Sequence, residues 1–207
     1  MESTTKYGRV ILRGRTTLMI NKRSNQLLDQ LETRDKTGED ESDLPREERA
    51  QRRLHLDEEG NPCLTAAMIR ETLKSAGRFV TYAGKKNVSN SKGETLLDSF
   101  FGLEDETFPI LDPENGKPAT WKADRRPVPQ KSGGGGTVVI RPAFPRWQVE
   151  IRFWFDAGEV KATKIERLFA EAVKKIGFGS GRTLGMGRAE IVLFEVEGDG
   201  EEDKNDE

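Results

Sequence analysis

The chain has 207 residues, of which 34% are hydrophobic and 34% are charged, so only part of it can form a buried core. Its one cysteine, Cys63, excludes an intramolecular disulfide and suits a reducing, cytoplasmic setting. The sequence has no secretion signal at its start and no apolar run near the roughly 18 residues of a membrane-spanning helix, so we expect no contact with a membrane.

The formal net charge of −2 is unevenly distributed. Glu197–Glu207 holds seven acidic residues and one lysine, and Glu39–Glu59 holds nine acidic residues and four arginines. The rest of the chain is therefore basic, which suits a polyanionic partner. We expect residues 197–207 to be an acidic disordered tail, and a role in solubility alone is the alternative for it.

The N-terminal part predicts one strand followed by polar segments. Residues 8–20 show apolar alternation and predict a strand. Residues 24–33 predict a short helix. Residues 34–61 are charged and almost free of apolar side chains, which predicts a mobile insertion.

The next segment predicts a helix over residues 64–80, with Thr65 as its N-cap. Its apolar residues recur at helical spacing and form one stripe: Ile69, Leu73, Ala76 and Val80. Residues 81–136 are rich in Gly, Pro, Asn, Asp and Ser and predict a long irregular excursion.

Two strands are predicted over 137–144 and 146–156, paired through a bend at Pro145. Alternation in the second strand gives it one core face and one polar face. The core face holds Trp147, Val149, Ile151, Phe153 and Phe155, and the polar face holds Arg146, Gln148, Glu150, Arg152 and Trp154.

A second helix is predicted from Thr163, which forms a capping-box pattern with Glu166, to the natural stop at Gly177. Its apolar side follows spacings of three and four: Ile165, Leu168, Phe169, Ala172, Val173 and Ile176. Residues 189–196 predict a closing strand.

This order of elements predicts an α+β fold, a ferredoxin-like βαββαβ antiparallel sheet with large insertions in the first crossover. We expect residues 1–33 and 137–196 to form a discontinuous core. Residues 34–136, which include the helix at 64–80, would form an insertion that projects like a thumb.

A glycine-rich loop, GFGSGRTLGMG, joins the second helix to the closing strand and fits G-x-G-x-x-x-x-x-G-x-G. Its residues with a predicted binding role are Gly177, Gly179, Gly181, Arg182, Gly185, Gly187 and Arg188. Glycine lets a backbone approach a ligand closely, exposed N–H groups can bind an anion, and arginine adds forked donors for phosphate. A tight turn without a ligand is the alternative.

In this loop, at this place in the order of elements, the chain resembles the RAMP superfamily of CRISPR-associated RNA-binding proteins and their phage-borne relatives. A second segment, LTAAMIRETLK from Leu64 to Lys74, resembles a degenerate copy of a segment that opens a helix in backbone subunits of that family. The resemblance implies that Arg70 and Lys74 contact RNA, while the family's serines and glycine are absent here. The opening RGRTTLMINK also resembles the first strand of RAMP-like phage proteins.

The polar face of the predicted sheet offers further RNA contacts through Arg13, Arg15, Arg152 and Trp154. Packing of this face on the insertion or on a neighbouring subunit is the alternative. A basic and aromatic stretch in the excursion is a second candidate arm for RNA, or a solvated loop: Trp121, Lys122, Arg125, Arg126 and Lys131.

The sequence gives little indication of a catalytic site or a metal site. His55 is the only histidine, and RAMP endoribonucleases often use a histidine; we expect it to be an idle, exposed residue. Some RAMP backbone subunits cleave RNA with an aspartate after the first strand, and nothing singles out one of Asp29, Asp35, Asp40 and Asp43. One Cys and one His cannot form a usual zinc site, so we expect no metal and no cofactor.

The leading hypothesis is a non-catalytic subunit that holds single-stranded or guide RNA by its phosphates and assembles in several copies in a CRISPR-like ribonucleoprotein complex. Two alternatives stay open: a metal-independent endoribonuclease that processes CRISPR RNA, and a phage nucleic-acid-binding or assembly protein with a RAMP-like fold.

Overall fold

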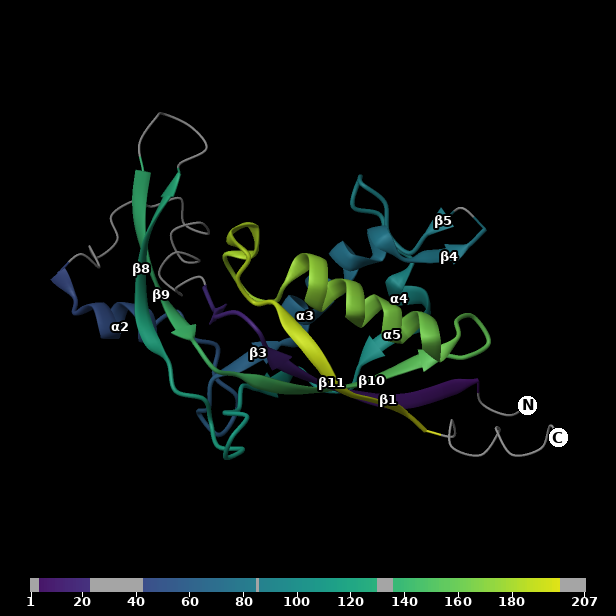
Figure 1. The fold of residues 1–207 in the computed structure, drawn as a ribbon, viewed down its shortest axis with the longest axis horizontal. Coiled ribbons are helices and arrows are strands. Elements are labelled where there is room, and N and C mark those ends of the chain that lie inside the picture. Colours follow the sequence, from purple (N-terminus) through teal and green to yellow (C-terminus); the bar gives the residue numbers. More distant parts are fainter. Residues whose placement is uncertain (1–3, 23–42, 85, 130–135, 198–207) are drawn as a thin grey trace, which may run out of the picture.

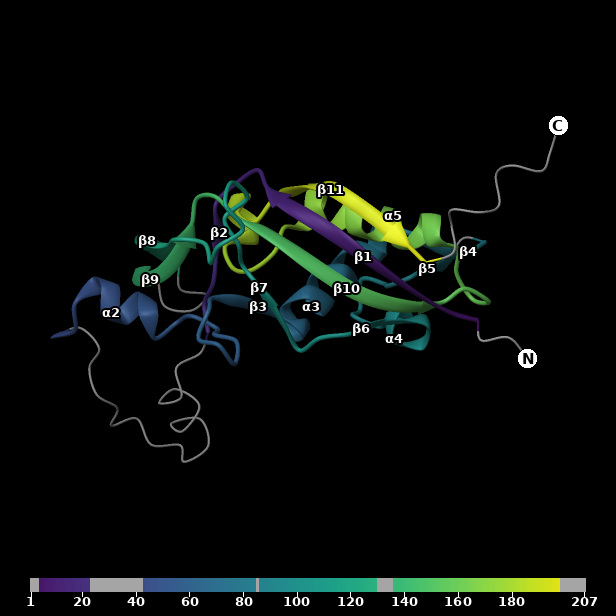
Figure 2. The same ribbon diagram turned by 90° about the horizontal axis from the view of Figure 1, so that it is seen from below.

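The computed structural model describes residues 4–22, 43–84, 86–129 and 136–197, and its centre is a four-stranded antiparallel sheet. The strands, in spatial order, are β11 (Ala189–Val196), β1 (Thr5–Gly14), β10 (Gln148–Asp156) and β6 (Phe101–Leu103). The helices α3 (Ala66–Ala76) and α5 (Ala162–Glu171) cover one face of the sheet (Figure 1). Figure 2 shows the opposite face, which none of the described helices covers. The predicted α+β class is confirmed at this level.

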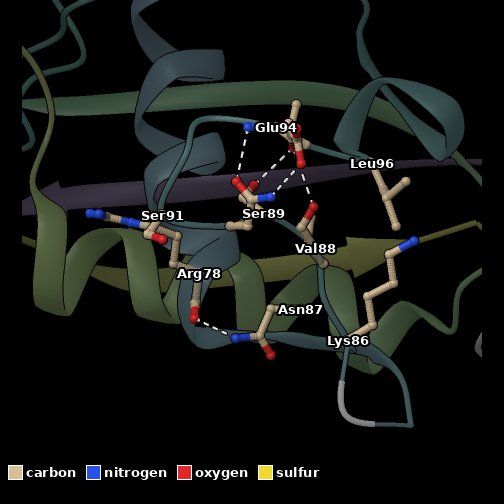
Figure 3. Close-up of a pocket in the computed structure, with 10 residues that line it drawn as sticks. Arg78, Lys86, Asn87, Val88, Ser89, Ser91, Glu94 and Leu96 are labelled. Carbon is tan, nitrogen blue, oxygen red and sulfur yellow. Dashed lines mark hydrogen bonds between the residues drawn. The ribbon is translucent and has the colours of Figure 1, made fainter.

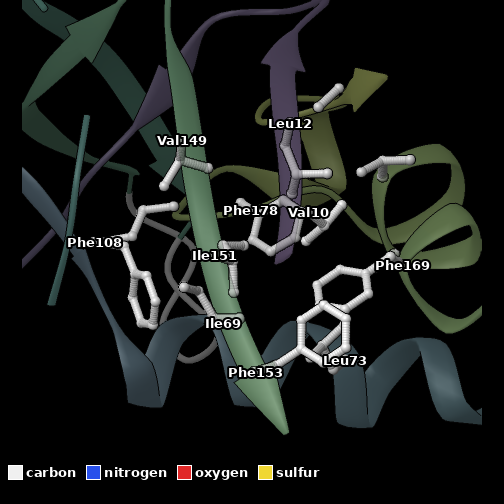
Figure 4. Close-up of a cluster of buried hydrophobic side chains, with 14 of the residues drawn as sticks. Val10, Leu12, Ile69, Leu73, Phe108, Val149, Ile151, Phe153, Phe169 and Phe178 are labelled. Atoms are coloured by element: carbon white, nitrogen blue, oxygen red, sulfur yellow. The ribbon is translucent and has the colours of Figure 1, made fainter. Parts of the chain in front are cut away.

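The alternation predicted for β10 is confirmed. Its core-facing side chains have no exposed surface: Val149, Ile151, Phe153 and Phe155. They meet Val10 and Leu12 of β1 and the helices in one apolar cluster (Figure 4). Phe153 contacts several aromatic rings of this cluster, with its ring centroid 5.4 Å from that of Phe169 on α5 and 5.7 Å from that of Phe101 on β6.

The predicted N-cap and apolar stripe of α3 are both confirmed, but the helix is shorter than predicted. The hydroxyl of Thr65 accepts a hydrogen bond from the backbone N–H of Met68, as an N-cap does. The stripe of Ile69, Leu73 and Ala76 is buried. The α-helix ends at Ala76 and continues as one 3₁₀ turn, η2 (Gly77–Phe79), so the predicted end at residue 80 was late.

The helix α5 begins one residue before Thr163, and its N-cap is Lys161 without a side-chain cap, so the predicted capping box is wrong. Its last turn widens into a π-helical turn, η3 (Ala172–Ile176). Gly177 then ends the helix with a φ of 84°, which confirms the predicted stop. The closing strand is confirmed as β11.

The pairing predicted between 137–144 and 146–156 is wrong. β9 (Gly136–Phe144) pairs with β8 (Lys122–Pro129) and β2 (Leu18–Met19), while β10 pairs with β1 and β6. The chain leaves one sheet and enters another between the two predicted partners. Figure 1 shows the β8–β9 hairpin projecting from one end of the central sheet, with α2 (Arg46–Gln51) beside it.

The first predicted strand, 8–20, is also two strands. β1 ends at Gly14, because the backbone N–H groups of Arg15 and Thr16 donate to the carbonyl of Arg188 and turn the chain out of the sheet. The chain then forms β2 in the hairpin sheet.

The prediction of an irregular excursion over 81–136 is wrong. Besides β6 and β8, it contains β4 (Thr81–Ala83), β5 (Lys86–Asn87), α4 (Leu97–Phe100) and β7 (Thr107–Pro109), and β7 pairs with β3 (Cys63–Thr65). Most of these elements are too short to show a hydrophobic period.

The mobile insertion predicted over 34–61 is wrong for its described part, because α2 packs on the hairpin and both Ala50 and Leu54 are buried. The helix predicted at 24–33 and the acidic tail after Glu197 lie outside the described residues. The proposed division into core and thumb-like insertion stays a prediction, and within 34–136 the strand β6 joins the edge of the central sheet.

Candidate nucleic-acid interface

All five glycines of the loop have positive φ angles, between 69° and 84°. Gly181 and Gly185 flank a single 3₁₀ turn, η4 (Arg182–Leu184), and both adopt the left-handed conformation. This conformation strains any other residue, so the glycine spacing follows directly from the path of the backbone.

Three of these glycines are also required by close backbone packing. A Cβ atom would lie 2.4 Å from the carbonyl oxygen of Met186 at Gly177, and 2.3 Å from that of Met19 at Gly179. At Gly187 it would lie 2.0 Å from the carbonyl oxygen of Phe178. By contrast, a Cβ at Gly185 would meet no heavy atom within 4 Å. The protein itself therefore accounts for the glycine at three positions.

The prediction that the loop's N–H groups point outward is wrong for most of them. Three bind the segment from Thr16 to Met19, which runs from the β1–β2 connection into β2. Ser180 N–H donates to the carbonyl of Met19 at 2.8 Å, Gly187 N–H to the carbonyl of Thr17 at 2.9 Å, and Arg188 N–H to the hydroxyl of Thr16 at 2.9 Å. Five more donate within the loop or to the preceding turn, from residues 177, 178, 184, 185 and 186. Within the described ranges, the N–H groups of residues 179, 181, 182 and 183 have no acceptor.

Some polar side-chain atoms of the loop lack hydrogen-bond partners, whereas most of its backbone N–H groups have acceptors. One guanidinium nitrogen of Arg188, Nη1, is buried and has no hydrogen-bond partner in the described structure. The same holds for the hydroxyl of Ser180. Arg182 is half-buried at the start of η4, and Thr183 beside it is exposed. If the loop binds an anion, we therefore expect its arginine side chains to contribute more hydrogen-bond donors than its backbone N–H groups.

The loop and the β8–β9 hairpin are joined through β2. The carbonyl of Met19 accepts the hydrogen bond from Ser180, while Met19 itself pairs with Ala143 of β9. Both features lie at the same end of the central sheet in two perpendicular views (Figures 1 and 2). The basic and aromatic stretch that was predicted between Trp121 and Lys131 therefore contains the hairpin strand β8. It includes Lys122 and Arg125, both exposed, while Lys131 lies outside the described residues.

The arginines of the uncovered sheet face are engaged with acceptors of the protein. Arg15 pairs with Glu190 at 2.8 Å, and Arg152 with Asp105 at 3.2 Å. Arg13 donates to the amide oxygen of Gln148 at 3.4 Å. The neighbouring Arg9, not singled out in the sequence, pairs with Glu195 at 2.7 Å. Carboxylates of β11 and of the loop after β6 therefore neutralise much of the positive charge on this face.

Trp154 is half-buried on the same face, and its indole lies over Gly102 of β6, where a Cβ would come within 2.5 Å of the ring. Arg70 of α3 is exposed and held by Asp98 of α4, with Nε 2.7 Å from Oδ1, and this hydrogen bond raises the pKa of Arg70. Lys74 is half-buried one turn later. The structure thus gives Trp154 and Arg70 intramolecular partners.

His55 lies in an ordered segment and is half-buried, so its predicted exposed position is wrong. Burial lowers its pKa, and the charge of Lys22 acts in the same direction. Of the four aspartates considered, Asp29, Asp35 and Asp40 lie outside the described residues, and Asp43 lies just before α2. The described ranges contain no cluster of three potential metal ligands.

A surface pocket of about 590 Å³ lies beside η2 and β5 (Figure 3). Several of its polar groups bond to one another: the side-chain amide of Asn87 donates to the carbonyl of Arg78, and that of Asn90 to the carboxylate of Glu94. It is lined by elements other than the glycine loop and the hairpin. No helix in the described part of the chain has the length and apolar character to span a membrane.

No protein-family model matches the chain. No curated protein matches it either. Among solved structures, it is similar to a chain in the cryo-EM structure of the Type III-B Cmr-beta bound to cognate target RNA, with 13% identity and a TM-score of 0.47. The match covers 93% of this chain, which spans 60% of the length of that one.

Proposed function

We propose that this chain binds single-stranded RNA as a guide RNA-type backbone subunit of a CRISPR-like ribonucleoprotein complex, with other subunits and further copies of itself as partners. The observation that carries the proposal is Arg188. Its Nη1 is buried without an acceptor in the described structure, whereas Arg9, Arg15 and Arg152 of the uncovered sheet face all bind carboxylates.

A buried guanidinium nitrogen without an acceptor is costly, and a phosphate oxygen would satisfy it with a charge-assisted hydrogen bond. The hydroxyl of Ser180, buried and unpartnered in the same loop, could donate to the same kind of group. Arg182 and the N–H groups at the start of η4 add donors beside them. Phosphate contacts hold a nucleic acid without reading its sequence, as a subunit that carries interchangeable guides requires.

The arrangement of the central sheet supports the fold part of the resemblance. We propose that the core is ferredoxin-like, with β6 as the second strand of the βαββαβ order in place of residues 137–144. The helices α3 and α5 then follow the first and third strands of that order, and the β8–β9 hairpin belongs to the insertion.

Binding of a fluorescent single-stranded RNA, measured across a range of salt concentrations, tests the function. Arg188→Gln is expected to weaken binding by roughly 10- to 100-fold, the cost of one charge-assisted hydrogen bond. The slope of log affinity against log salt should flatten by about 0.7, as for one lost phosphate contact to a single strand. The matched control, Arg9→Gln, removes an arginine that Glu195 already binds and should change affinity little.

Nuclease digestion of any nucleic acid that co-purifies with the protein identifies the polymer. RNase-sensitive material supports the proposal, and DNase-sensitive material favours a DNA-binding role. If the parent protein binds no RNA, or if Arg188→Gln and Arg9→Gln behave alike, the proposed function is wrong.

A further inference from the structure

An exposed aromatic ring lies where the C-terminal end of α3 meets η3. Phe79, in the 3₁₀ turn η2 that follows α3, has an exposed fraction of 42%. Nζ of Lys175 in η3 lies 4.4 Å from the centroid of this ring, and Cζ of Arg78 lies 5.9 Å from it. The ring therefore presents apolar surface to solvent beside two positive charges.

Arg78 links this ring to the surface pocket beside η2 and β5 (Figure 3). Its Nε donates to the carbonyl of Ser75 at 3.2 Å, which holds the guanidinium in place and leaves both Nη groups without an acceptor in the described structure. Lys86 also lines the pocket, and its ammonium group has no ion pair with any described residue. The side chains of Arg78 and Lys86 extend in opposite directions in Figure 3, so they would meet different phosphates of an extended strand. Arg78, Phe79, Lys86 and Lys175 together form the Phe79 patch.

Carboxylates are few around the Phe79 patch. Glu94 is the one acidic residue among the described residues that line the pocket, and its Oε2 accepts a hydrogen bond from the side-chain amide of Asn90. Glu171, one turn before Lys175, pairs with that lysine at 2.7 Å. By contrast, carboxylates bind most of the arginines of the uncovered sheet face. The patch therefore keeps positive charge that a polyanion can meet.

Bare carbonyl groups at the C-terminal end of α3 would repel an anion, because they carry the negative end of the helix dipole. Several of them are occupied instead. Besides the carbonyl bound by Arg78, that of Gly77 accepts from the backbone N–H of Ser89 at 3.1 Å. The carbonyl of Arg78 accepts from the side-chain amide of Asn87 at 2.8 Å. The helix end is therefore compatible with a phosphate near the guanidinium of Arg78.

We propose that the Phe79 patch binds a short stretch of single-stranded nucleic acid. A nucleobase stacks on the exposed part of the Phe79 ring, and the cations beside the ring meet the flanking phosphates. Stacking on an aromatic side chain needs an unpaired base, so a single strand fits this patch better than a duplex. The choice of RNA as the strand rests on the proposed function. The contact itself is separate from the glycine loop, which begins two residues after Lys175.

The first arm of the test changes the ring and measures binding of two fluorescent single strands of the same sequence, one RNA and one DNA. Phe79→Leu keeps an apolar side chain but removes the aromatic face, so it should weaken binding by roughly 5- to 100-fold. The salt dependence should stay unchanged, because stacking releases no counterion. Phe79→Tyr should bind like the parent. The matched control is Tyr7→Leu, which removes a ring of similar exposure, 44%, from the uncovered sheet face and should change affinity little.

The second arm changes the charge. Arg78→Gln should weaken binding and flatten the slope of log affinity against log salt by about 0.7, as for one lost phosphate contact to a single strand. Its control is Arg146→Gln, which removes an exposed arginine that Asp112 and Glu114 already bind and should leave the slope as it is. If Phe79→Leu does not fold, the comparison of Arg78→Gln with Arg146→Gln decides alone.

The outcomes separate this inference from the proposed function. If Phe79→Leu and Tyr7→Leu bind alike, the patch binds no nucleobase and the inference is wrong, whatever Arg188→Gln does. Weak binding by Phe79→Leu together with normal binding by Arg188→Gln would support the patch and contradict the use of the glycine loop.

The DNA strand separates the patch from the choice of RNA. A parent protein that binds only the DNA strand, and loses it in Phe79→Leu, would support the patch and contradict the proposed RNA partner. If the parent binds neither strand, both the proposed function and this inference are wrong.

Discussion

Gly187→Ala is expected to destabilise the protein far more than Gly185→Ala, although both substitutions fall in the same loop. The two glycines have φ angles of 70° and 77°, so alanine meets a left-handed strain of about 1–2 kcal/mol at either position. They differ in their surroundings. A Cβ at Gly185 enters open space, whereas at Gly187 it meets the backbone oxygen of Phe178 at 2.0 Å and the backbone nitrogen at 2.7 Å.

Because backbone atoms cannot rotate away, Gly187→Ala must separate the two chain segments. That separation breaks the hydrogen bond from Phe178 N–H to the carbonyl of Gly187 and the one from Gly187 N–H to Thr17. Each such bond contributes about 1 kcal/mol, so the two bonds and the left-handed strain together should cost about 3–4 kcal/mol.

Thermal unfolding followed by circular dichroism measures both variants. In a domain of this size 1 kcal/mol corresponds to roughly 2–4 °C in Tm, so Gly185→Ala should lower Tm by about 2–8 °C and Gly187→Ala by roughly 6–16 °C. Equal shifts in the two variants would refute the argument that backbone packing requires glycine at position 187.

Two further predictions concern titration. Burial raises the pKa of the Cys63 thiol to about 11, with the charge of Asp57 acting in the same direction, so its contribution to stability is full below about pH 9 and is lost as the pH rises through about 11. Urea unfolding across this range should show a shallower alkaline decline for Cys63→Ala than for the parent, and parallel curves would contradict the burial of the thiol. Burial lowers the pKa of His55, so its contribution is full above about pH 6.5, the value in the unfolded chain, and is lost as the pH falls through the lower folded value. His55→Ala should reduce this acid decline and leave RNA binding intact, whereas cleavage of a stem-loop RNA that disappears in this variant would establish the endoribonuclease alternative.

Local patterns in the sequence were sufficient for the elements whose own residues decide their structure. β10 alternates over nine residues, and its buried side chains were all identified from that period. Thr65 caps α3 through an atom three residues away, and Gly177 ends the second helix through its own φ angle. Each signal lies within a few residues of the feature that it predicts, which is why the sequence alone could show it.

Strand partners and the use of the loop depended on contacts between distant parts of the chain. β6 has three residues, too few for a period, and only packing against β10 and Phe169 makes it the fourth strand of the sheet. The loop's N–H groups looked available for a ligand, but Thr17 and Met19 supply carbonyl acceptors from the other end of the chain. Arginine presents the same donors everywhere in a sequence. Only the fold decides which guanidinium groups meet a carboxylate, because that pairing depends on the tertiary neighbours of each side chain. The guanidinium groups of Arg49, Arg141 and Arg188 each have a buried nitrogen that has no acceptor in the described structure.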